Sequence, residues 1–285
     1  MEPLPELPES VRLTEPSPGY PVLDIRHPRC SARVALHGAH VMEWQPASAD
    51  APVLYLSPDA VYREGKAIRG GIPICWPWFN AHPTDPSQPS HGHARTQFWD
   101  LDAVDEDKLG IHLSLSFRHE GLTAWVDILL GEALEISLHT NNHGSRPVPL
   151  SGALHTYLAV SSAPQVQIDG LDGDLYLDTV GPRVERRQDG LVFFDGEVDR
   201  IYENDSSTLL VDPGYERVIV IEKEGSPSTV VWNPWVEKAG TLADLPDEGW
   251  RDFVCIEAAI ANDRAIILAP GGSHTLTTTL RVEDH

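Results

Sequence analysis

The stretch Ile111-His-Leu-Ser-Leu-Ser-Phe117 alternates apolar and polar side chains without a break. Successive side chains of a β-strand point to opposite faces, so this alternation predicts a strand with one buried face. The stretch Leu134-Glu-Ile-Ser-Leu-His139 repeats the pattern, and the turn-forming residues Asn141-Asn-His-Gly144 follow it. The two segments therefore predict two half-buried strands.

Further strands are predicted where β-branched and aromatic residues gather. These segments are 216–222, 229–232, 253–257 and 274–282. Helical periodicity is scarce, and only Lys238 to Leu245 is predicted to form a short helix before Pro246. Many closely spaced strands with few helices predict an all-β protein, built as a large sandwich of antiparallel sheets.

The domain organisation is predicted to be simple. No internal repeat, linker or change in composition divides the chain, so we expect a single domain over residues 21–285. Residues 1–20 are acidic and proline-rich, and we expect an irregular arm without a secretory signal. No segment approaches the roughly 20 apolar residues of a membrane-spanning helix. We therefore expect a cytoplasmic protein, and we expect it to be a monomer.

Charge and cysteine content restrict the possible partners. The chain of 285 residues has 21 Lys and Arg against 43 Asp and Glu, a net charge of −22. This charge argues against nucleic acid or an anionic membrane as the main partner, because both require a cationic face. The cysteines Cys30, Cys75 and Cys255 are far apart and have no metal or redox spacing, which predicts buried free thiols.

Two segments with unusual composition interrupt the strand pattern. In Ile68–Phe79, two prolines and three aromatic residues exclude an ordinary central strand. Aromatic faces there suit stacking on a sugar or filling the core. In His91-Gly-His-Ala-Arg95, an arginine and two histidines gather donors, and a guanidinium binds phosphate or carboxylate bidentately. His91 and His93 could also bind a metal, but no Glu or Cys lies at a useful spacing, so no metal is predicted.

Two further segments place titratable groups on strand faces. His155 and Tyr157 share one face of a predicted strand, where a histidine is either a core residue or a proton carrier near neutral pH. Glu257 shares a face with Phe253 and Cys255, two residues that prefer burial. A buried carboxylate is costly unless it is paired or functional, and burial raises its pKa. Alternatively, Glu257 lies in solvent at a strand end.

Five motifs in order resemble the hexose-6-phosphate mutarotases (glucose-6-phosphate 1-epimerases) of the aldose 1-epimerase superfamily. The motifs are Ile68–Phe79, His91–Arg95, Leu154–Tyr157, Val231–Trp235 and Val254–Glu257. The similarity covers the chain from about Val34 to Val282. It implies the galactose-mutarotase-like β-sandwich, which agrees with the predicted strands. It also implies an enzyme that interconverts the α and β anomers of a phosphorylated hexose without a metal or other cofactor.

The resemblance also implies roles for individual residues. His155 corresponds to the general acid and Glu257 to the general base; we expect a nearby carboxylate to keep His155 protonated. Implied substrate-binding positions are Arg69, His91, Arg95 and Asp199, with both arginines at the 6-phosphate. We add Trp76 and Trp232 as candidate substrate-binding aromatic residues.

Two residues depart from the family pattern, and two alternative functions remain open. Asn80 stands where the family usually has glycine, and His93 stands where it has an aromatic residue. Residues 62–95 contain four basic and two acidic residues, a local net charge of +2 that favours a phosphorylated substrate. The alternatives are an epimerase of unphosphorylated aldoses and a non-catalytic carbohydrate-binding module on the same fold.

Overall fold

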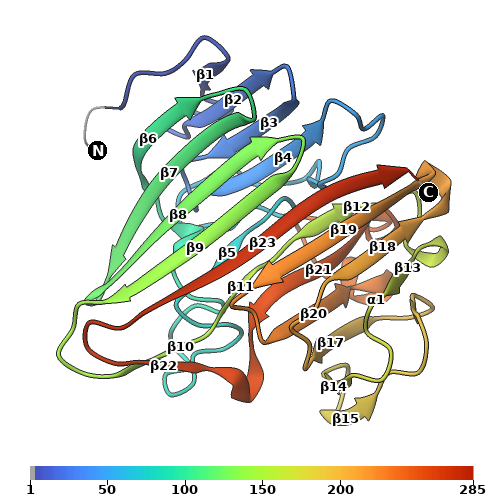
Figure 1. Cartoon of the computed structure of the whole chain (residues 1–285). Helices are drawn as coiled ribbons and strands as arrows, with labels where there is room; N and C mark the ends of the chain where they lie inside the picture. Colours follow the sequence, from blue (N-terminus) through green and yellow to red (C-terminus); the bar gives the residue numbers. More distant parts are fainter. Residues whose placement is uncertain (1–3, 285) are drawn as a thin grey trace.

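The computed structural model describes residues 4–284, and strands account for most of its regular structure (Figure 1). Four antiparallel strands at the N-terminal end form one sheet in sequence order: β1 (Val11–Thr14), β2 (Val22–His27), β3 (Cys30–Ala35) and β4 (His40–Pro46). Every strand pairing in the sheets is antiparallel, as predicted from the sequence.

A nine-stranded sheet forms one layer of the sandwich, in the order β16-β13-β18-β19-β23-β9-β8-β7-β6. Its strands are β6 (Asp100–Glu106), β7 (Gly110–His119), β8 (Leu122–Gly131), β9 (Leu134–Asn142), β13 (Gln167–Asp169), β16 (Val192–Phe193), β18 (Thr208–Asp212), β19 (Arg217–Glu224) and β23 (Ser273–Asp284). The predicted strands 111–117, 134–139, 216–222 and 274–282 all fall in this sheet, and each prediction is confirmed.

An eight-stranded sheet forms the opposite layer, in the order β15-β14-β17-β20-β21-β11-β5, with β12 also paired to β21. Its strands are β5 (Ile74–Cys75), β11 (Gly152–Leu154), β12 (Tyr157–Ala159), β14 (Leu175–Asp178), β15 (Val184–Arg187), β17 (Val198–Tyr202), β20 (Ser228–Asn233) and β21 (Phe253–Ile260). The predicted strands 229–232 and 253–257 are confirmed here. A two-stranded sheet, β10 (Val148–Leu150) with β22 (Ile266–Leu268), completes the strands.

Helical structure is limited to short segments. The α-helix α1 spans Trp235–Ala239, so it begins three residues before the predicted helix and ends well before Leu245. The reason is local, because the Asn233 side chain accepts a hydrogen bond from the Trp235 N–H and thereby sets the start. The 3-10 turns are η1 (Ala94–Thr96), η2 (Ala163–Gln165), η3 (Pro213–Tyr215), η4 (Gly249–Arg251) and η5 (Asn262–Arg264). Residues 4–284 contain no helix with the length and hydrophobicity of a membrane-spanning segment.

The N-terminal segment is more regular than the sequence predicted. Residues 1–3 of the predicted irregular arm lie outside the described residues, but Val11–Thr14 forms β1 and pairs with β2. The Val11 side chain is buried, and the buried Tyr20 hydroxyl lies 3.1 Å from Nδ1 of His37. The prediction of an irregular segment is therefore wrong for Val11–Thr14, because this stretch pairs with β2 as an edge strand of the first sheet.

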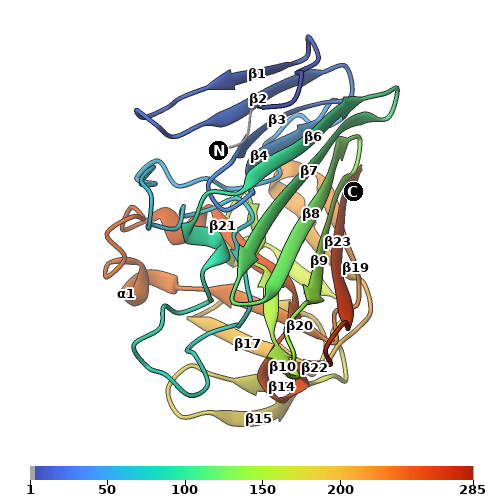
Figure 2. The same cartoon turned by 90° about the vertical axis from the view of Figure 1, so that its left-hand side faces the viewer.

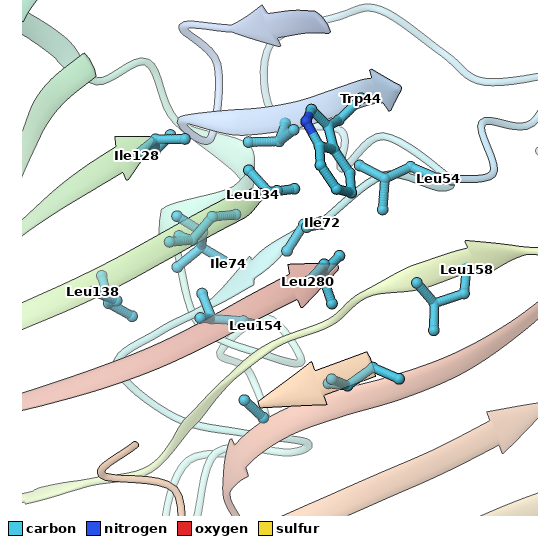
Figure 3. Close-up of a cluster of buried hydrophobic side chains, with 14 of the residues drawn as sticks. Trp44, Leu54, Ile72, Ile74, Ile128, Leu134, Leu138, Leu154, Leu158 and Leu280 are labelled. Atoms are coloured by element: carbon cyan, nitrogen blue, oxygen red, sulfur yellow. The ribbon is translucent and has the colours of Figure 1, made fainter. Parts of the chain in front are cut away.

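The main core lies between the two large sheets. Figure 3 shows part of it, with Ile128, Leu134 and Leu138 of the nine-stranded sheet facing Leu154 and Leu158 of the opposite layer. The inward residues of each strand supply this core, so the alternation seen in the sequence decides which side chains enter it.

The other face of the eight-stranded sheet is covered as well. Figure 2 shows α1 and the connection after β5 on the side away from the nine-stranded sheet. Two smaller apolar clusters lie on this outer face, one around Tyr157, Phe253 and Cys255 and the other around Cys75 and Ala259. Consequently every residue of β21 is buried. The three cysteines are buried and free, as predicted.

Candidate active site

The covered outer face of the eight-stranded sheet brings His155 and Glu257 together. Leu154 pairs with Ala258 and Tyr157 with Cys255, so the same register places His155 beside Glu257. His155 Nδ1 lies 3.3 Å from Glu257 Oε1. These two groups are 102 positions apart in the sequence, and the pairing of β21 with β11 and β12 positions them.

The segment around His155 differs slightly from the predicted continuous strand. The ladder is interrupted between β11 and β12, where the Thr156 N–H donates to the Leu154 carbonyl. The rings of His155 and Tyr157 nevertheless lie on one side, stacked with centroids 4.9 Å apart and planes at 10°. The prediction that they share a face is therefore confirmed. The edge-on ring of Trp232 at 5.9 Å also restricts the imidazole.

Glu257 is a buried carboxyl group. Its exposed fraction is 1%, and it lies along β21 between Cys255 of one apolar cluster and Ala259 of the other. Burial raises its pKa well above the usual range, and the nearby Asp199 carboxylate raises it further. Its Oε2 has no hydrogen-bond partner among residues 4–284. The alternative that Glu257 lies in solvent is therefore wrong, and an unpartnered buried carboxyl oxygen indicates a functional group.

The protonation of His155 differs from the expectation. Burial, followed by the electrostatic effects of His91, Arg95 and Arg69, lowers its pKa well below the usual range. The neighbouring Glu257 does not overcome these effects, because burial also favours the neutral form of that carboxyl group. Burial therefore favours the neutral imidazole and the neutral carboxyl group, the form in which Glu257 holds the proton. The pair still carries the single proton that acid–base chemistry requires.

Arg69 reaches the site from the Ile68–Phe79 segment. Its Nη1 donates to the Tyr157 hydroxyl at 3.0 Å, and the Gly71 carbonyl accepts from the Tyr157 N–H at 2.9 Å. Gly71 has a φ of +59°, and a Cβ there would lie 2.3 Å from the Val41 carbonyl oxygen. The glycine is therefore needed for this close backbone approach.

The His91–Arg95 motif lies beside the same pair. The His91 ring centroid is 6.1 Å from that of His155. The Asn80 N–H donates to His91 Nδ1 at 3.2 Å, so the proton of the neutral ring is on Nε2. Burial, then Arg95 and Arg69, lowers the pKa of His91 to about 3. His91 is therefore a neutral donor at physiological pH.

Arg95 is a cation with unused donors. Its Nη2 donates to the Ser90 carbonyl at 3.0 Å, while its Nε is buried without a partner among residues 4–284. Its positive charge lowers the pKa of both His91 and His155. Gly92 makes the bend possible, since a Cβ there would lie 1.9 Å from the Trp76 carbonyl oxygen.

Asp199 and Trp232 lie on the same sheet face. Trp232 of β20 pairs with Asp199 on one side and with Cys255 on the other. Cys255 pairs in turn with Tyr157. Burial raises the pKa of Asp199 above its usual range. Asp199 and Trp232 therefore lie on the sheet face that carries His155 and Glu257.

Trp76 does not belong to the site. Its side chain is 1% exposed and packs in the main core, where its indole N–H donates to the Thr140 hydroxyl at 3.0 Å. It directly follows Cys75, the last residue of β5, and the extended backbone there sends the two side chains to opposite faces. The prediction of Trp76 as a sugar-stacking residue is wrong, and the core-filling alternative is correct for this ring.

Two residues of the site were not identified from the sequence. Tyr157 joins Arg69 to the face of His155, although the sequence indicated only a shared strand face. Asp244 binds Arg69, with its Oδ1 3.0 Å from Nη2. Asp244 lies in a segment predicted to be helical, and nothing in the sequence connects it to an arginine 175 positions away.

The two departures from the family pattern have structural explanations. Asn80 adopts a φ of +62°, a left-handed conformation that asparagine tolerates better than most residues and that glycine adopts freely. The His93 ring lies against Trp78 and His119, at 5.1 and 4.3 Å, whereas the His91 ring packs against Phe79 and His155. The rings of His91 and His93 thus have different neighbours and do not form the metal pair that their spacing allowed.

Among residues 4–284, a group of three or more potential metal ligands is found only at the centre of the site. Among the described residues, His155, Cys255 and Glu257 have donor atoms within 4.8 Å of one another. Burial raises the pKa of the Cys255 thiol well above its usual range, so the thiolate that a metal needs is disfavoured. The group is therefore better suited to proton transfer than to metal binding.

Comparison with known proteins agrees with this geometry. The family model described as aldose 1-epimerase matches residues 21–281. An Escherichia coli protein named "Putative glucose-6-phosphate 1-epimerase" is 33% identical over 269 residues, covering 90% of this chain and 89% of the relative. A Cenchrus ciliaris protein of the same name is 34% identical, covering 85% and 78%.

A crystal structure described as "a putative mutarotase (YeaD)" from Salmonella typhimurium has the same fold. It superposes with a TM-score of 0.91 and 29% sequence identity, covering 99% of this chain and 97% of that one. The predicted resemblance and the predicted sandwich are both confirmed. The chain belongs to the aldose 1-epimerase family of sugar isomerases.

Proposed function

We propose that this enzyme interconverts the α and β anomers of a hexose 6-phosphate of the glucose 6-phosphate type by general acid–base catalysis. The observation that supports it most directly is the His155–Glu257 pair, with Nδ1 and Oε1 3.3 Å apart on a covered sheet face. Arg69 and Arg95 supply cationic groups next to this pair. The names of the curated relatives support the same substrate class.

The reaction requires two coupled proton movements. The C1 hydroxyl loses a proton while the ring oxygen gains one; the ring opens, the aldehyde turns, and closure occurs from the other face. Both oxygen atoms are bonded to C1, so an acid and a base that lie close together can serve them at once. We assign the base to Glu257 and the acid to His155, with the roles exchanged for the other anomer. Each positioned group contributes roughly 10²- to 10⁴-fold.

In this mechanism, phosphate binding changes the protonation of the His155–Glu257 pair. The charges of Arg95 and Arg69 help to lower the pKa of His155. A phosphate dianion bound to these arginines would offset their positive charge and so raise that pKa toward its usual range. The proton would then move from Glu257 to His155, which produces the carboxylate base and the imidazolium acid. Phosphate binding and catalysis are coupled in this mechanism.

The remaining predicted residues orient the sugar. His91 offers its Nε2–H as a neutral donor. Asp199 offers a carboxyl group to sugar hydroxyls, and Trp232 offers an aromatic surface on the same sheet face. These groups recognise the pyranose itself, whereas Arg69 and Arg95 recognise the anionic substituent.

An epimerase of unphosphorylated aldoses would use the same pair without the arginines, and Arg95→Ala separates the two possibilities. We expect this variant to raise KM for glucose 6-phosphate by about tenfold to a hundredfold, the range for a lost charged hydrogen bond. KM for glucose should change little. The control is Arg281→Ala, which removes an arginine that pairs with Glu222 on the other sheet. Equal effects of Arg95→Ala on both sugars would remove phosphate recognition from the proposal.

We also propose that the enzyme is a cytoplasmic monomer. Its three cysteines are free, as is usual in a reducing compartment. Sedimentation at micromolar concentration tests the monomer, and a mass that rises with concentration would contradict it.

A further inference from the structure

We propose that Asp244 is a positioning residue that fixes Arg69 for contact with the 6-phosphate and thereby contributes to substrate specificity. The inference depends on the proposed function, because it concerns the same substrate. It gives a role to a buried carboxylate that touches neither His155 nor Glu257. Asp244 lies in the segment between α1 and η4, which crosses the covered face of the eight-stranded sheet.

The contacts of Asp244 hold the guanidinium on one side. Its Oδ1 accepts from Nε of Arg69 at 3.1 Å and lies 3.0 Å from Nη2. The Asp244 side chain is 7% exposed and that of Arg69 is 22% exposed, so water screens the pair weakly. The Ser57 hydroxyl donates to the Asp244 carbonyl at 2.7 Å and so anchors the backbone. The carboxylate therefore has a fixed position.

The opposite side of the guanidinium is also held. Nη1 of Arg69 donates to the Tyr157 hydroxyl at 3.0 Å. An arginine side chain has five N–H donors, and the hydrogen bonds to Asp244 and Tyr157 use two of them, one on Nε and one on Nη1. N–H groups therefore remain on both terminal nitrogens. Donors on the two terminal nitrogens of a guanidinium can bind two phosphate oxygens bidentately.

This arrangement joins the anion site to the proton carriers. The ring of Tyr157 stacks on His155 at 4.9 Å, and His155 lies 3.3 Å from Glu257. The chain Asp244–Arg69–Tyr157 thus sets the distance between the point where the phosphate binds and the point where C1 reacts. The exocyclic bonds from C5 to phosphorus limit how far the phosphate of a hexose 6-phosphate can lie from C1, so a fixed Arg69 favours it over substrates of another length.

Asp244 could alternatively act only through its negative charge. Its Oδ2 also lies 3.5 Å from Lys66 Nζ, so it neutralises part of the local cationic charge. A carboxylate that acted only in this way would repel the phosphate and weaken binding. Positioning and repulsion therefore predict opposite changes in KM when the carboxylate is removed, and this difference makes the proposal testable.

The experiment compares Asp244→Ala with Asp244→Asn on glucose 6-phosphate and on glucose. The alanine variant removes the acceptor, and we expect KM for glucose 6-phosphate to rise by about tenfold to a hundredfold. The asparagine variant keeps an oxygen acceptor for Arg69 and should recover most of the affinity. KM for glucose and kcat for both sugars should change far less. An unchanged or lower KM for glucose 6-phosphate in Asp244→Ala would overturn the proposal.

Two further variants separate position from stability and charge. Glu222→Ala removes the acidic partner of Arg281 in the nine-stranded sheet and should leave both KM values unchanged. Asp244→Glu keeps the charge but moves the carboxylate by one methylene, so positioning predicts a higher KM even if Asp244→Ala fails to fold. An unchanged KM in Asp244→Glu would refute the proposal. A wild-type enzyme with no preference for glucose 6-phosphate would instead refute the proposed function, whereas a preference that persists in Asp244→Ala refutes only the role of Asp244.

Discussion

The two large sheets of this protein differ in how far their polar side chains are exposed to solvent. In β8 of the nine-stranded sheet, buried residues alternate with half-buried or exposed ones, so polar groups reach solvent. In β21 of the eight-stranded sheet, all eight residues are buried. A polar side chain on β8 thus keeps its hydration, whereas one on β21 must be paired or functional. Glu257 is the carboxyl group in that second environment, and the difference between the sheets explains why the chemistry is found there.

The largest effect is expected from removing the buried carboxyl group. Glu257→Gln preserves the shape of the side chain but cannot act as a base, so we expect the catalysed rate to fall by about 10²- to 10⁴-fold. Sugar binding should stay within about tenfold of wild type, since an amide can still form neutral hydrogen bonds. Exchange NMR between the two anomers measures the rate. Glu135→Gln, an exposed change on β9, is the matched control and should retain full activity. Unchanged turnover in Glu257→Gln would show that Glu257 is not the base.

Truncating a core side chain on the inner face of either sheet should destabilise the protein by a similar amount. Ile256 of β21 and Ile128 of β8 both belong to the main core. We expect Ile256→Ala and Ile128→Ala each to lower the free energy of unfolding by about 2–5 kcal/mol, because each leaves a cavity. Urea denaturation measures this change. We expect folded Ile256→Ala to keep much more activity than Glu257→Gln. An equal loss would contradict the assignment of the core to the inner face of β21 and of the site to its outer face.

The pH dependence of stability should also distinguish the buried carboxyl group. The pKa of Glu257 is raised in the folded state, so above pH about 4.3 the folded protein holds a proton that the unfolded chain releases. The contribution of this group is therefore lost as pH rises toward the folded pKa. Glutamine does not titrate, so the stability advantage of Glu257→Gln over wild type should grow between pH 5 and pH 8. Thermal unfolding at several pH values measures it, and an advantage that shrinks with rising pH would contradict the burial argument.

The smallest effect is expected on the outer face of the nine-stranded sheet. The Ser137 hydroxyl lies 2.9 Å from that of Thr277 on the neighbouring strand, in a partly exposed position. Because water can replace this hydrogen bond, Ser137→Ala should change the free energy of unfolding by no more than about 0.5 kcal/mol. A loss above 2 kcal/mol in urea denaturation would show that this face is less solvated than its burial pattern indicates.

The sequence predicted the regular sheet better than the site. Alternation placed β7 and β9 correctly, because one face of each meets the core and the other meets solvent. For β21 the same alternation could not decide whether Glu257 was buried or in solvent. The answer depends on what covers the outer face, and distant segments around Arg69 and Asp244 cover it.

The errors in predicting individual site residues also arise because the folded environment of a side chain is not visible in the local sequence. Trp76 was assigned to the sugar because aromatic rings suit that role, but its strand sends the ring to the core. His155 was expected to be cationic because a carboxylate is near, but burial outweighs that neighbour. Six other predicted site residues lie on one sheet face or beside it: Arg69, His91, Arg95, Asp199, Trp232 and Glu257. Asp244 could not be found in this way, since only the folded chain brings it to Arg69.

The most direct test of the central claim is polarimetry of freshly dissolved α-glucose 6-phosphate. With the enzyme present, the optical rotation should reach its equilibrium value much faster than in buffer, and faster than in a matched experiment with α-glucose. That result would support an acid–base pair working beside a phosphate site. Relaxation of the phosphorylated sugar at the buffer rate would contradict the account.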